Sequence, residues 1–380
     1  MAHPGDLDTS FGNGGKKTVN FGGVDAANVV LVQRNGRVVA AGGGGPASSF
    51  CVVRLRSANG TLDPTFGSGG KRVIDFGTDD EAVHGAALQP DRKIVLAGDA
   101  RLQPAVVRLT PNGTLDPTFD GDGRKVFSWG AIGRVTAVVV APNGKILLGG
   151  FSGPEGGNIQ VARLKANGAF DTTFGTGGVA AVDFGGTEFG EAMARQADGR
   201  ILVAGRASPG GAVVARLRAT GALDPDFGAG GRVTLSAATS AGAVLVQPDR
   251  NILVAGNTSG SAVMTVTRLR PDGSLETTFG SAGTATVDFG SLADLLGGAV
   301  LQPDGKIVLA GYTQASEDVA VARLNANGLP DATFGAGGKA TVDFGVATFG
   351  NAVALAPNGR IVVAGQKTGA DDFAVARLRG

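Results

Sequence analysis

The chain has 380 residues, of which 65 are glycine and 43% are apolar, while only 18% are charged. Disorder needs low hydrophobicity and high net charge, and collagen needs glycine at every third residue, so both classes are excluded. The 34 Lys and Arg against 33 Asp and Glu leave a formal net charge of +1, so no basic excess is available and we expect no nucleic-acid partner.

The N-terminal residues, Met1 to Asp6, lack the basic region and apolar stretch of a signal peptide, as expected for a trimmed chain. No apolar run in the sequence is long enough to cross a bilayer as a helix, so no transmembrane segment is expected. The single Cys51 excludes a disulfide within the chain and a zinc cluster.

A short phrase, Leu-Asp-Pro-Thr-Phe-Gly at Leu62 to Gly67, recurs with small changes along the whole chain. A recurrence at 52 to 55 residues is typical of a repeat protein, and seven copies predict one domain over residues 1–380. The recurring phenylalanines are Phe11, Phe66, Phe119, Phe174, Phe227, Phe279 and Phe334.

Four strand signals occur within each unit, as the sixth unit illustrates. Gly298 to Gln302 is followed by the turn Pro-Asp-Gly and by Lys306 to Gly311, and Asp-Gly between two apolar runs predicts a hairpin. The third and fourth strands are expected at Val319 to Leu324 and at Lys339 to Phe344. No unit shows a long helical period. Four short strands per unit predict an all-β, seven-bladed β-propeller with four antiparallel strands in each blade.

The two ends of the sequence indicate how the ring closes. The chain begins with an isolated fourth strand, Lys16 to Phe21, and ends with an isolated third strand, Ala374 to Arg379. If these two strands pair, the N-terminal strand completes the last blade and removes two exposed sheet edges.

The repeat phrases resemble the delta-60 repeat of bacterial exported and surface proteins over essentially the whole chain. The resemblance is carried by the phrase at Leu62 to Gly67, by Gln302 to Gly311 and by Val321 to Leu324. It implies an extracellular, cell-surface or periplasmic location, and it brings no activity or catalytic residues with it.

Two further motifs are interpreted as architecture. Asp-Phe-Gly at Asp75, Asp183, Asp288 and Asp343 recurs at blade spacing, unlike the single copy of a kinase. Gly42 to Gly45 lacks the lysine and helix of a phosphate-binding loop and is expected to be a flexible loop.

One arginine and one acid recur in all seven units, which favours an internal clamp over a binding site. The arginines are Arg54, Arg108, Arg163, Arg216, Arg268, Arg323 and Arg377. The acids are Asp8, Asp63, Asp116, Asp171, Asp224, Glu276 and Asp331.

Functional residues are expected where the units differ, and two positions before each hairpin lead into the first strands. Positions are counted back from the residue that precedes each hairpin turn. The fifth residue upstream of it is Asn28, His84, Thr136, Glu191, Gly242, Gly297 or Asn351. The eighth residue upstream of it is Asp25, Glu81, Gly133, Glu188, Thr239, Asp294 or Thr348. These residues are predicted to ring one mouth of the axial channel as a solvated rim or a ligand site. The ligand-binding candidates are Asp25, Asn28, Glu81, His84, Glu188, Glu191, Asp294 and Asn351.

Two chemistries remain open at this mouth. The acids offer oxygen ligands to Ca²⁺, while His84 offers a metal ligand or an acid–base group. Among the aromatic residues, only Tyr312 and Phe151 are expected to project from variable loops. These loops are expected at 42–50, 98–105, 150–160, 205–213, 256–263, 311–319 and 365–373.

The preferred interpretation is a monomeric, non-catalytic, exported or cell-surface scaffold without a required cofactor. Such a scaffold binds a protein or surface polymer through variable loops on one face. The alternative is a metal-assisted hydrolase or lyase at the axial mouth, with Asp25, Glu81, His84 and Glu191 as candidate groups. In the preferred interpretation, no residue is assigned a catalytic role.

Overall fold

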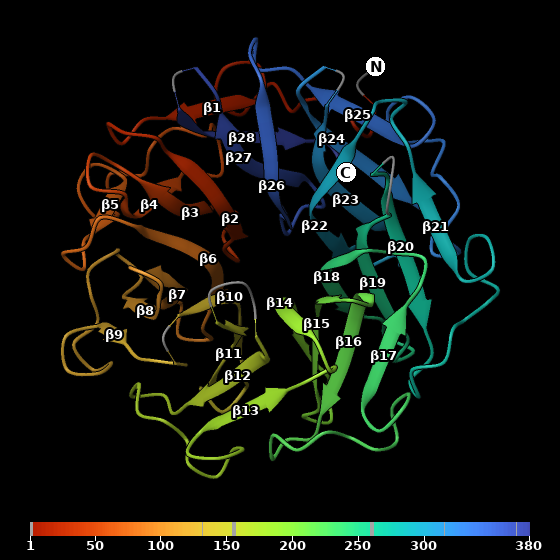
Figure 1. The fold of residues 1–380 in the computed structure, drawn as a ribbon. Helices are drawn as coiled ribbons and strands as arrows, with labels where there is room; N and C mark the ends of the chain where they lie inside the picture. The colour runs from red at the N-terminus through yellow and green to blue at the C-terminus, as the bar shows by residue number, and fades with distance from the viewer. Residues whose placement is uncertain (1–2, 131, 154–156, 259–261, 315, 370) are drawn as a thin grey trace.

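The computed structural model describes residues 3–130, 132–153, 157–258, 262–314, 316–369 and 371–380. These residues form seven antiparallel sheets of four strands each, arranged as blades around a common axis (Figure 1). The predicted all-β, seven-bladed propeller is confirmed. None of the described residues forms a helix long and apolar enough to cross a membrane.

Each blade runs from the axis outward, with an inner, a second, a third and an outer strand (Figure 1). The inner strands are β2 (Ala26–Val32), β6 (Glu81–Leu88), β10 (Gly133–Val140), β14 (Thr187–Arg195), β18 (Ser240–Val246), β22 (Asp294–Leu301) and β26 (Thr348–Leu355). The second strands are β3 (Val38–Gly44), β7 (Ile94–Ala100), β11 (Ile146–Ser152), β15 (Ile201–Ser208), β19 (Ile252–Asn257), β23 (Ile307–Thr313) and β27 (Ile361–Lys367).

The two strands nearer the rim complete each blade. The third strands are β4 (Ser49–Leu55), β8 (Gln103–Leu109), β12 (Ile159–Leu164), β16 (Gly211–Leu217), β20 (Met264–Leu269), β24 (Asp318–Leu324) and β28 (Asp372–Leu378). The outer strands are β5 (Lys71–Ile74), β9 (Arg124–Val126), β13 (Val179–Val182), β17 (Arg232–Leu235), β21 (Thr284–Val287), β25 (Lys339–Val342) and β1 (Lys16–Val19). Blades are numbered 1 to 7 from β2.

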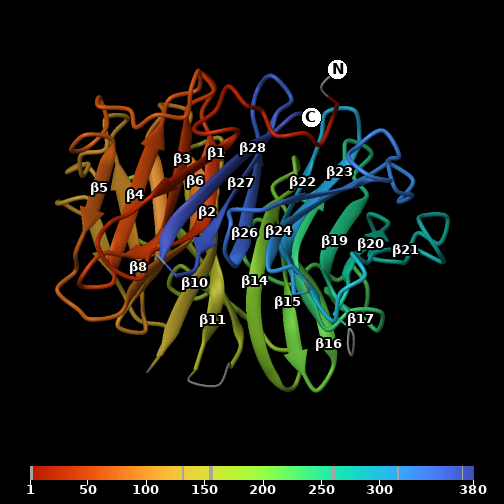
Figure 2. The same cartoon turned by 90° about the horizontal axis from the view of Figure 1, so that it is seen from above.

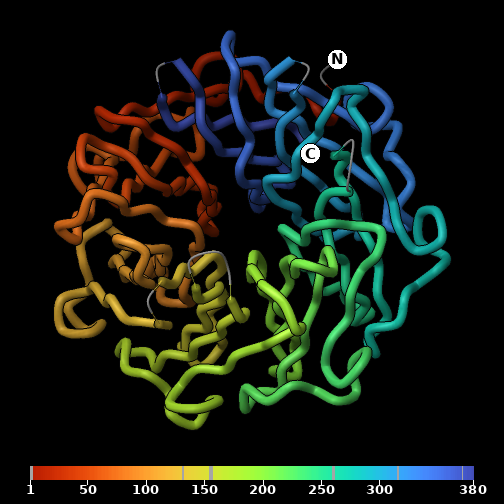
Figure 3. The backbone as a smooth tube through the Cα atoms, viewed as in Figure 1, coloured from red at the N-terminus to blue at the C-terminus, as the bar shows by residue number. Residues whose placement is uncertain are grey.

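The ring closes through β1, which is the first strand of the chain and the outer strand of blade 7 (Figure 3). It pairs antiparallel with β28, so that Lys16 lies opposite Ala376 and Val19 lies opposite Phe373. The predicted closure by the N-terminal strand is therefore present, and no blade is left with three strands.

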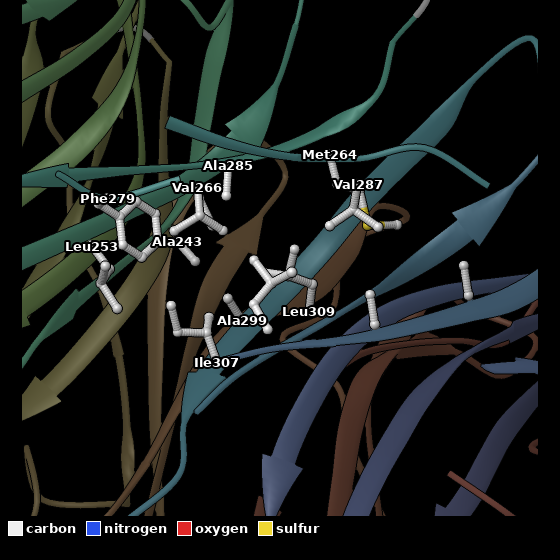
Figure 4. Packing of buried hydrophobic residues seen from close by; sticks show 14 residues of the cluster. Ala243, Leu253, Met264, Val266, Phe279, Ala285, Val287, Ala299, Ile307 and Leu309 are labelled. Carbon is white, nitrogen blue, oxygen red and sulfur yellow. The ribbon is translucent and has the colours of Figure 1, made fainter. Parts of the chain in front are cut away.

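The hydrophobic cores lie between neighbouring blades because both faces of each sheet are apolar. Figure 4 shows one core, in which Leu253 and Val266 of blade 5 pack against Ile307 and Leu309 of blade 6. Phe279, the recurring phenylalanine of this unit, lies in the same core and is fully buried. Burial on both faces explains why the strands read as continuous apolar runs rather than as alternating ones.

The glycine of the recurring phrase is needed for its backbone conformation. Gly67 has a φ of +55°, and a Cβ on it would lie 2.1 Å from the carbonyl oxygen of Lys71. In the third copy Asp120 takes this position with a φ of 51°. Aspartate is one of the few side chains that visit this left-handed region.

Two expectations about local structure are wrong. Gly42 to Gly44 are not in a flexible loop but belong to β3, because Gly42 and Gly43 pair with Ala27 and Ala26 across the hairpin. The inner strand of the sixth unit begins at Asp294 rather than at Gly298, because the pairing with β23 continues past a bulge to Asp294, which lies opposite Thr313.

The antiparallel order gives the ring two different ends, which are seen from the side in Figure 2. The connection from second to third strand and the entry into the next inner strand share one end, here called the hairpin-loop face. The Pro-Asp-Gly turns and the recurring Leu-Asp-Pro-Thr-Phe-Gly phrase share the other end, the turn face. The variable loops predicted from the sequence are therefore all on one face.

Candidate functional site

The loops of the hairpin-loop face are shorter than predicted, because the strands extend into them. The loop of blade 2 consists only of Arg101 and Leu102, and that of blade 4 only of Pro209 and Gly210. Residues 154–156, 259–261, 315 and 370 of the predicted loops lie outside the described residues.

Six of the seven loops are tied to the next blade by a backbone hydrogen bond. The N–H of Glu81 donates to Ser48 of blade 1 at 2.9 Å, and the N–H of Asp25 donates to Asp371 of blade 7 at 2.7 Å. The donor is the eighth residue upstream of the turn in six units: Asp25, Glu81, Gly133, Glu188, Asp294 and Thr348. In blade 5 the N–H of Thr239 donates instead to Asn257 of the same blade at 2.8 Å.

The four acids at this position do not line the mouth of the channel, which corrects the expectation from the sequence. Asp25, Glu81, Glu188 and Asp294 are at most 1% exposed. Their carboxylates accept hydrogen bonds from the segment that enters the inner strand. Glu81 accepts from the N–H groups of Phe76 and Thr78 at 2.9 to 3.0 Å.

The same role recurs in the other acids of this group. Asp294 accepts from the N–H of Phe289 and from Ser291 Oγ, both at 2.6 Å, and Glu188 accepts from the N–H of Gly186 at 2.9 Å. Among the described residues, no group of three or more His, Cys, Asp or Glu side chains is placed to hold a metal ion. A calcium site built from these buried acids does not fit the structure.

The fifth residue upstream of each turn has a different environment, because it is the bulged residue of the inner strand. The pairing with the second strand skips this residue in every blade: Asn28, His84, Thr136, Glu191, Gly242, Gly297 and Asn351. A bulge turns the extra side chain out of the regular ladder.

Three of the bulged residues connect neighbouring inner strands. Asn28 Nδ2 donates to the carbonyl oxygen of Val83 at 3.0 Å, and Asn351 Nδ2 donates to that of Ala27 at 3.1 Å. Thr136 Oγ1 donates to the carbonyl oxygen of Gly190 at 2.7 Å. Asn28 and Asn351, proposed from the sequence as ligand contacts, therefore hold blade to blade.

His84 and Glu191 are the bulged residues with ionisable side chains, and each has a partner. His84 Nε2 lies 2.8 Å from Asp99 Oδ1, and Arg134 Nε lies 2.9 Å from the same oxygen. Glu191 Oε1 lies 3.6 Å from Arg206 Nε. Desolvation raises the pKa of the recessed Glu191 carboxyl, and Arg206 partly offsets this.

The aromatic residues expected to be free are not. Phe151 belongs to β11 and packs on Phe189 of the next blade, with ring centroids 4.9 Å apart. Tyr312 belongs to β23 and packs on Phe349 at 4.7 Å. Both pairs join a second strand to the next inner strand, so they are contacts between blades rather than platforms.

These contacts reveal a variable position that the sequence reasoning missed. It follows the small residue pair, Ala-Gly or Gly-Gly, of every second strand and faces the next blade near the hairpin-loop face. A comparison of the residues after this pair would have found it. The seven residues are Gly43, Asp99, Phe151, Arg206, Asn257, Tyr312 and Gln366.

Chemically active side chains gather in blades 2 to 4 as a connected row. His84 contacts Asp99, which contacts Arg134. Arg134 pairs across the hairpin with Phe151. In the next blade, Arg206 stacks over Phe189 at 4.3 Å. The corresponding positions elsewhere are small, apolar or uncharged, so this row breaks the sevenfold repetition of the ring.

Two of the larger pockets lie on opposite faces. One, of about 590 Å³, lies on the hairpin-loop face between blades 4 and 5 and is lined by Phe189, Arg206 and Asn257 among others. Another, of about 850 Å³, lies between the turns of blades 1 to 3 and is lined by Arg34 and Arg92 with apolar residues. Both volumes are within the range of ligand sites.

The recurring arginines lie away from these pockets, in a network beside the turn face. In six blades the arginine Nε donates to the recurring aspartate at 2.7 to 2.8 Å. The same guanidinium stacks over the recurring phenylalanine, as Arg54 does over Phe66 at 4.7 Å. In blade 5 the Glu276 carboxylate pairs instead with Arg270 at 3.0 Å, while the Arg268 guanidinium bonds Ala326 and Thr278.

A family model described as "Domain of unknown function (DUF5122) beta-propeller" matches seven segments that together make up more than half of the chain. The segments are 33–66, 89–119, 141–174, 196–227, 247–279, 302–334 and 356–379. The first six segments run from the end of an inner strand to the recurring phrase, and the last ends just after β28. No curated protein matches the sequence.

Solved structures that are similar in fold have diverse roles. Virginiamycin B lyase from Staphylococcus aureus, as a catalytically inactive variant with quinupristin, is 10% identical with a TM-score of 0.61, over 96% of this chain and 99% of that one. YCF48 bound to D1 peptide is 12% identical with a TM-score of 0.55, over 100% and 98%. The WD40 domain of Toxoplasma gondii coronin is 12% identical with a TM-score of 0.55, over 100% and 84%. At these identities the likeness concerns the fold alone.

Proposed function

The chain belongs to the family described as a domain of unknown function (DUF5122) β-propeller, and from its geometry we propose that it is a non-catalytic binding module. In this proposal the hairpin-loop face presents variable side chains on a rigid ring to a protein or polymer. The single observation that carries it is the location of the variation: loops and the variable second-strand position meet at one face, while the turn face repeats from blade to blade.

The rigidity of the frame supports this use. Backbone hydrogen bonds tie six of the seven loops to the next blade, and the loops themselves are as short as two residues in blade 2. A face that is already ordered loses little conformational entropy on binding. An exported or cell-surface location is part of the proposal and rests only on the resemblance of the repeats.

One observation favours the alternative that the protein is an enzyme. His84 is oriented by Asp99 at 2.8 Å, which is how a carboxylate fixes an imidazole that acts as a general base. However, Asp25 and Glu81 are buried and hydrogen-bonded to backbone, and Glu191 lies beside Arg206. A binding module therefore accounts for more of these contacts than a hydrolase or lyase does.

The proposal is tested by blocking one face at a time. Ala47 is exposed on the hairpin-loop face and Ala166 is exposed beside the turn face, so Ala47→Cys and Ala166→Cys accept a large maleimide-polyethylene glycol on opposite faces. The native Cys51 should not react, because burial raises the pKa of its thiol to about 12. Both labelled proteins are compared on immobilised peptides and polysaccharides.

We expect the label at residue 47 to block binding and the label at residue 166 to leave it unchanged. Binding that is lost only with the turn-face label would contradict the proposal. So would turnover of ester, lactone or glycan substrates that His84→Ala abolishes.

A further inference from the structure

The pocket between blades 4 and 5, here called the Arg206 pocket, has a lining suited to one kind of ligand. Its walls come from the end of β15, the loop at Pro209 and Gly210, and the start of blade 5. Among the described residues that line it, Arg206 is the only charged one. The pocket therefore offers a single positive charge on a face already proposed to bind.

Arg206 is held in place but its hydrogen-bonding capacity is unused. The guanidinium stacks over Phe189 at 4.3 Å, while its side chain remains 51% exposed. The distance of 3.6 Å from Nε to Glu191 Oε1 is too long for a hydrogen bond, and the guanidinium makes none to any other part of the chain that the structure describes. By contrast, the recurring Arg323 donates to two side chains.

The rest of the lining is rich in hydroxyl groups. Thr187, Ser208 and Ser240 line the pocket, and within the described ranges their hydroxyls make no hydrogen bond to protein. Thr239 and Asn257 also line the pocket, but their side chains are already engaged: Thr239 Oγ1 donates to the carbonyl oxygen of Asn257 at 3.1 Å, and Asn257 Nδ2 donates to that of Asp294 at 2.8 Å. Unused donors and acceptors around a pocket match the hydroxyls of a sugar better than they match the apolar side chains of a peptide.

We propose that the Arg206 pocket binds a carboxylated sugar residue of an acidic polysaccharide. The two parallel N–H groups of one guanidinium fit the two oxygens of a carboxylate, and one positive charge is matched by one negative charge. The hydroxyl groups of the pocket contact the sugar ring. This inference rests on the proposed use of the hairpin-loop face and adds the class of ligand.

The test uses a tetramer of galacturonic acid as the probe and its methyl ester as a neutral probe of the same shape. Titration calorimetry measures both against the wild-type chain and against Arg206→Met, which keeps the apolar stem over Phe189 and removes the donors. Arg34→Met is the matched control, because Arg34 is similarly exposed but lies on the opposite face. Thermal unfolding verifies that each variant is folded.

We expect the acid tetramer to bind and the ester to bind at least tenfold more weakly. Arg206→Met should weaken binding of the acid by about tenfold to a hundredfold, as the loss of a charge-assisted contact predicts, and Arg34→Met should not change it. Glu191→Gln should strengthen binding, because it removes the carboxylate that lies beside Arg206.

Four outcomes would overturn the inference, three of which concern relative binding. These are equal binding of acid and ester, unchanged binding by Arg206→Met, and tighter binding of a tetraglutamate peptide, which would assign the pocket to acidic peptides. Absence of uronate binding also overturns it. The proposed function would survive that result if the label at Ala47 still blocks another immobilised partner.

Discussion

At the scale of single residues, each recurring aspartate is buried and lies within ion-pair distance of at least two cationic side chains. Asp331 accepts from Arg323 at 2.7 Å and lies 3.0 Å from Lys306 Nζ, while Thr333 donates to its other oxygen at 2.8 Å. Burial alone would raise the pKa of this carboxyl, but the hydrogen bonds and the arginine lower it. The carboxylate therefore stays charged and joins a strand, a turn and the recurring phrase.

Blade 5 provides a natural comparison, because Asn251 replaces the second cation and Glu276 replaces the aspartate. Arg323→Ala should lower the free energy of unfolding by about 3 to 5 kcal/mol, since it breaks a buried ion pair. Arg268→Ala should cost about 1 kcal/mol, because among the described residues its guanidinium donates only to Ala326 and Thr278, at 3.1 and 3.5 Å. Urea titrations measure both, and equal losses would show that the carboxylate contact is not what stabilises the blade.

At the scale of strands, the bulge of each inner strand determines how closely two blades approach. Where the bulged residue is polar, as at Asn28, its side chain spans the gap and bonds the next inner strand. Where it is Gly297, the backbones themselves meet, because a Cβ there would lie 2.0 Å from the carbonyl oxygen of Gly350. At Gly242 the nearest atom to such a Cβ is 3.8 Å away.

These two glycines predict opposite tolerance to the same change. Gly297→Ala should destabilise the protein by about 1 to 3 kcal/mol, because blades 6 and 7 must move apart. Gly242→Ala should change the free energy of unfolding by less than about 0.5 kcal/mol, because the added methyl meets only Leu296. Thermal and urea unfolding of the two variants give the comparison; a well-tolerated Gly297→Ala would mean that the blades slide freely there.

At the scale of the whole molecule, stability depends on closure of the ring. β28 has apolar residues, including Phe373 and Val375, that are fully buried, and β1 covers their edge. Without β1 this edge would have unpaired N–H and C=O groups.

Deletion of residues 1–20 should therefore lower the midpoint of thermal unfolding by several degrees and cause self-association, since the free edge pairs with other copies. Deletion of residues 1–3 is the control and should leave both properties unchanged. Size-exclusion chromatography with thermal unfolding tests this. A truncated chain that remains monomeric and equally stable would show that blade 7 is complete with three strands.

Repetition made the ring predictable, because seven copies of one pattern repeat every strand signal and the unmatched ends of the chain identify β1 and β28 as partners. The site was less predictable. The contact between Phe151 and Phe189 joins different units, and alignment of the units places these residues in separate columns. Acidity at Asp25 and Glu81 suggested a cation site, but these buried carboxylates accept hydrogen bonds from backbone N–H groups of neighbouring loop segments.

The closure through β1 and β28 also has a mechanical consequence. The N–H of Gly5 donates to Arg379 and that of Asp8 to Arg377, so the two ends of the chain leave the same edge of an antiparallel pair. Tension applied between residues 5 and 379 would load these hydrogen bonds one after another, as in unzipping, rather than all together, as in shear. A propeller pulled at both ends of the chain would therefore open first where β1 pairs with β28. A propeller anchored through only one end of the chain would experience no force across this strand pair.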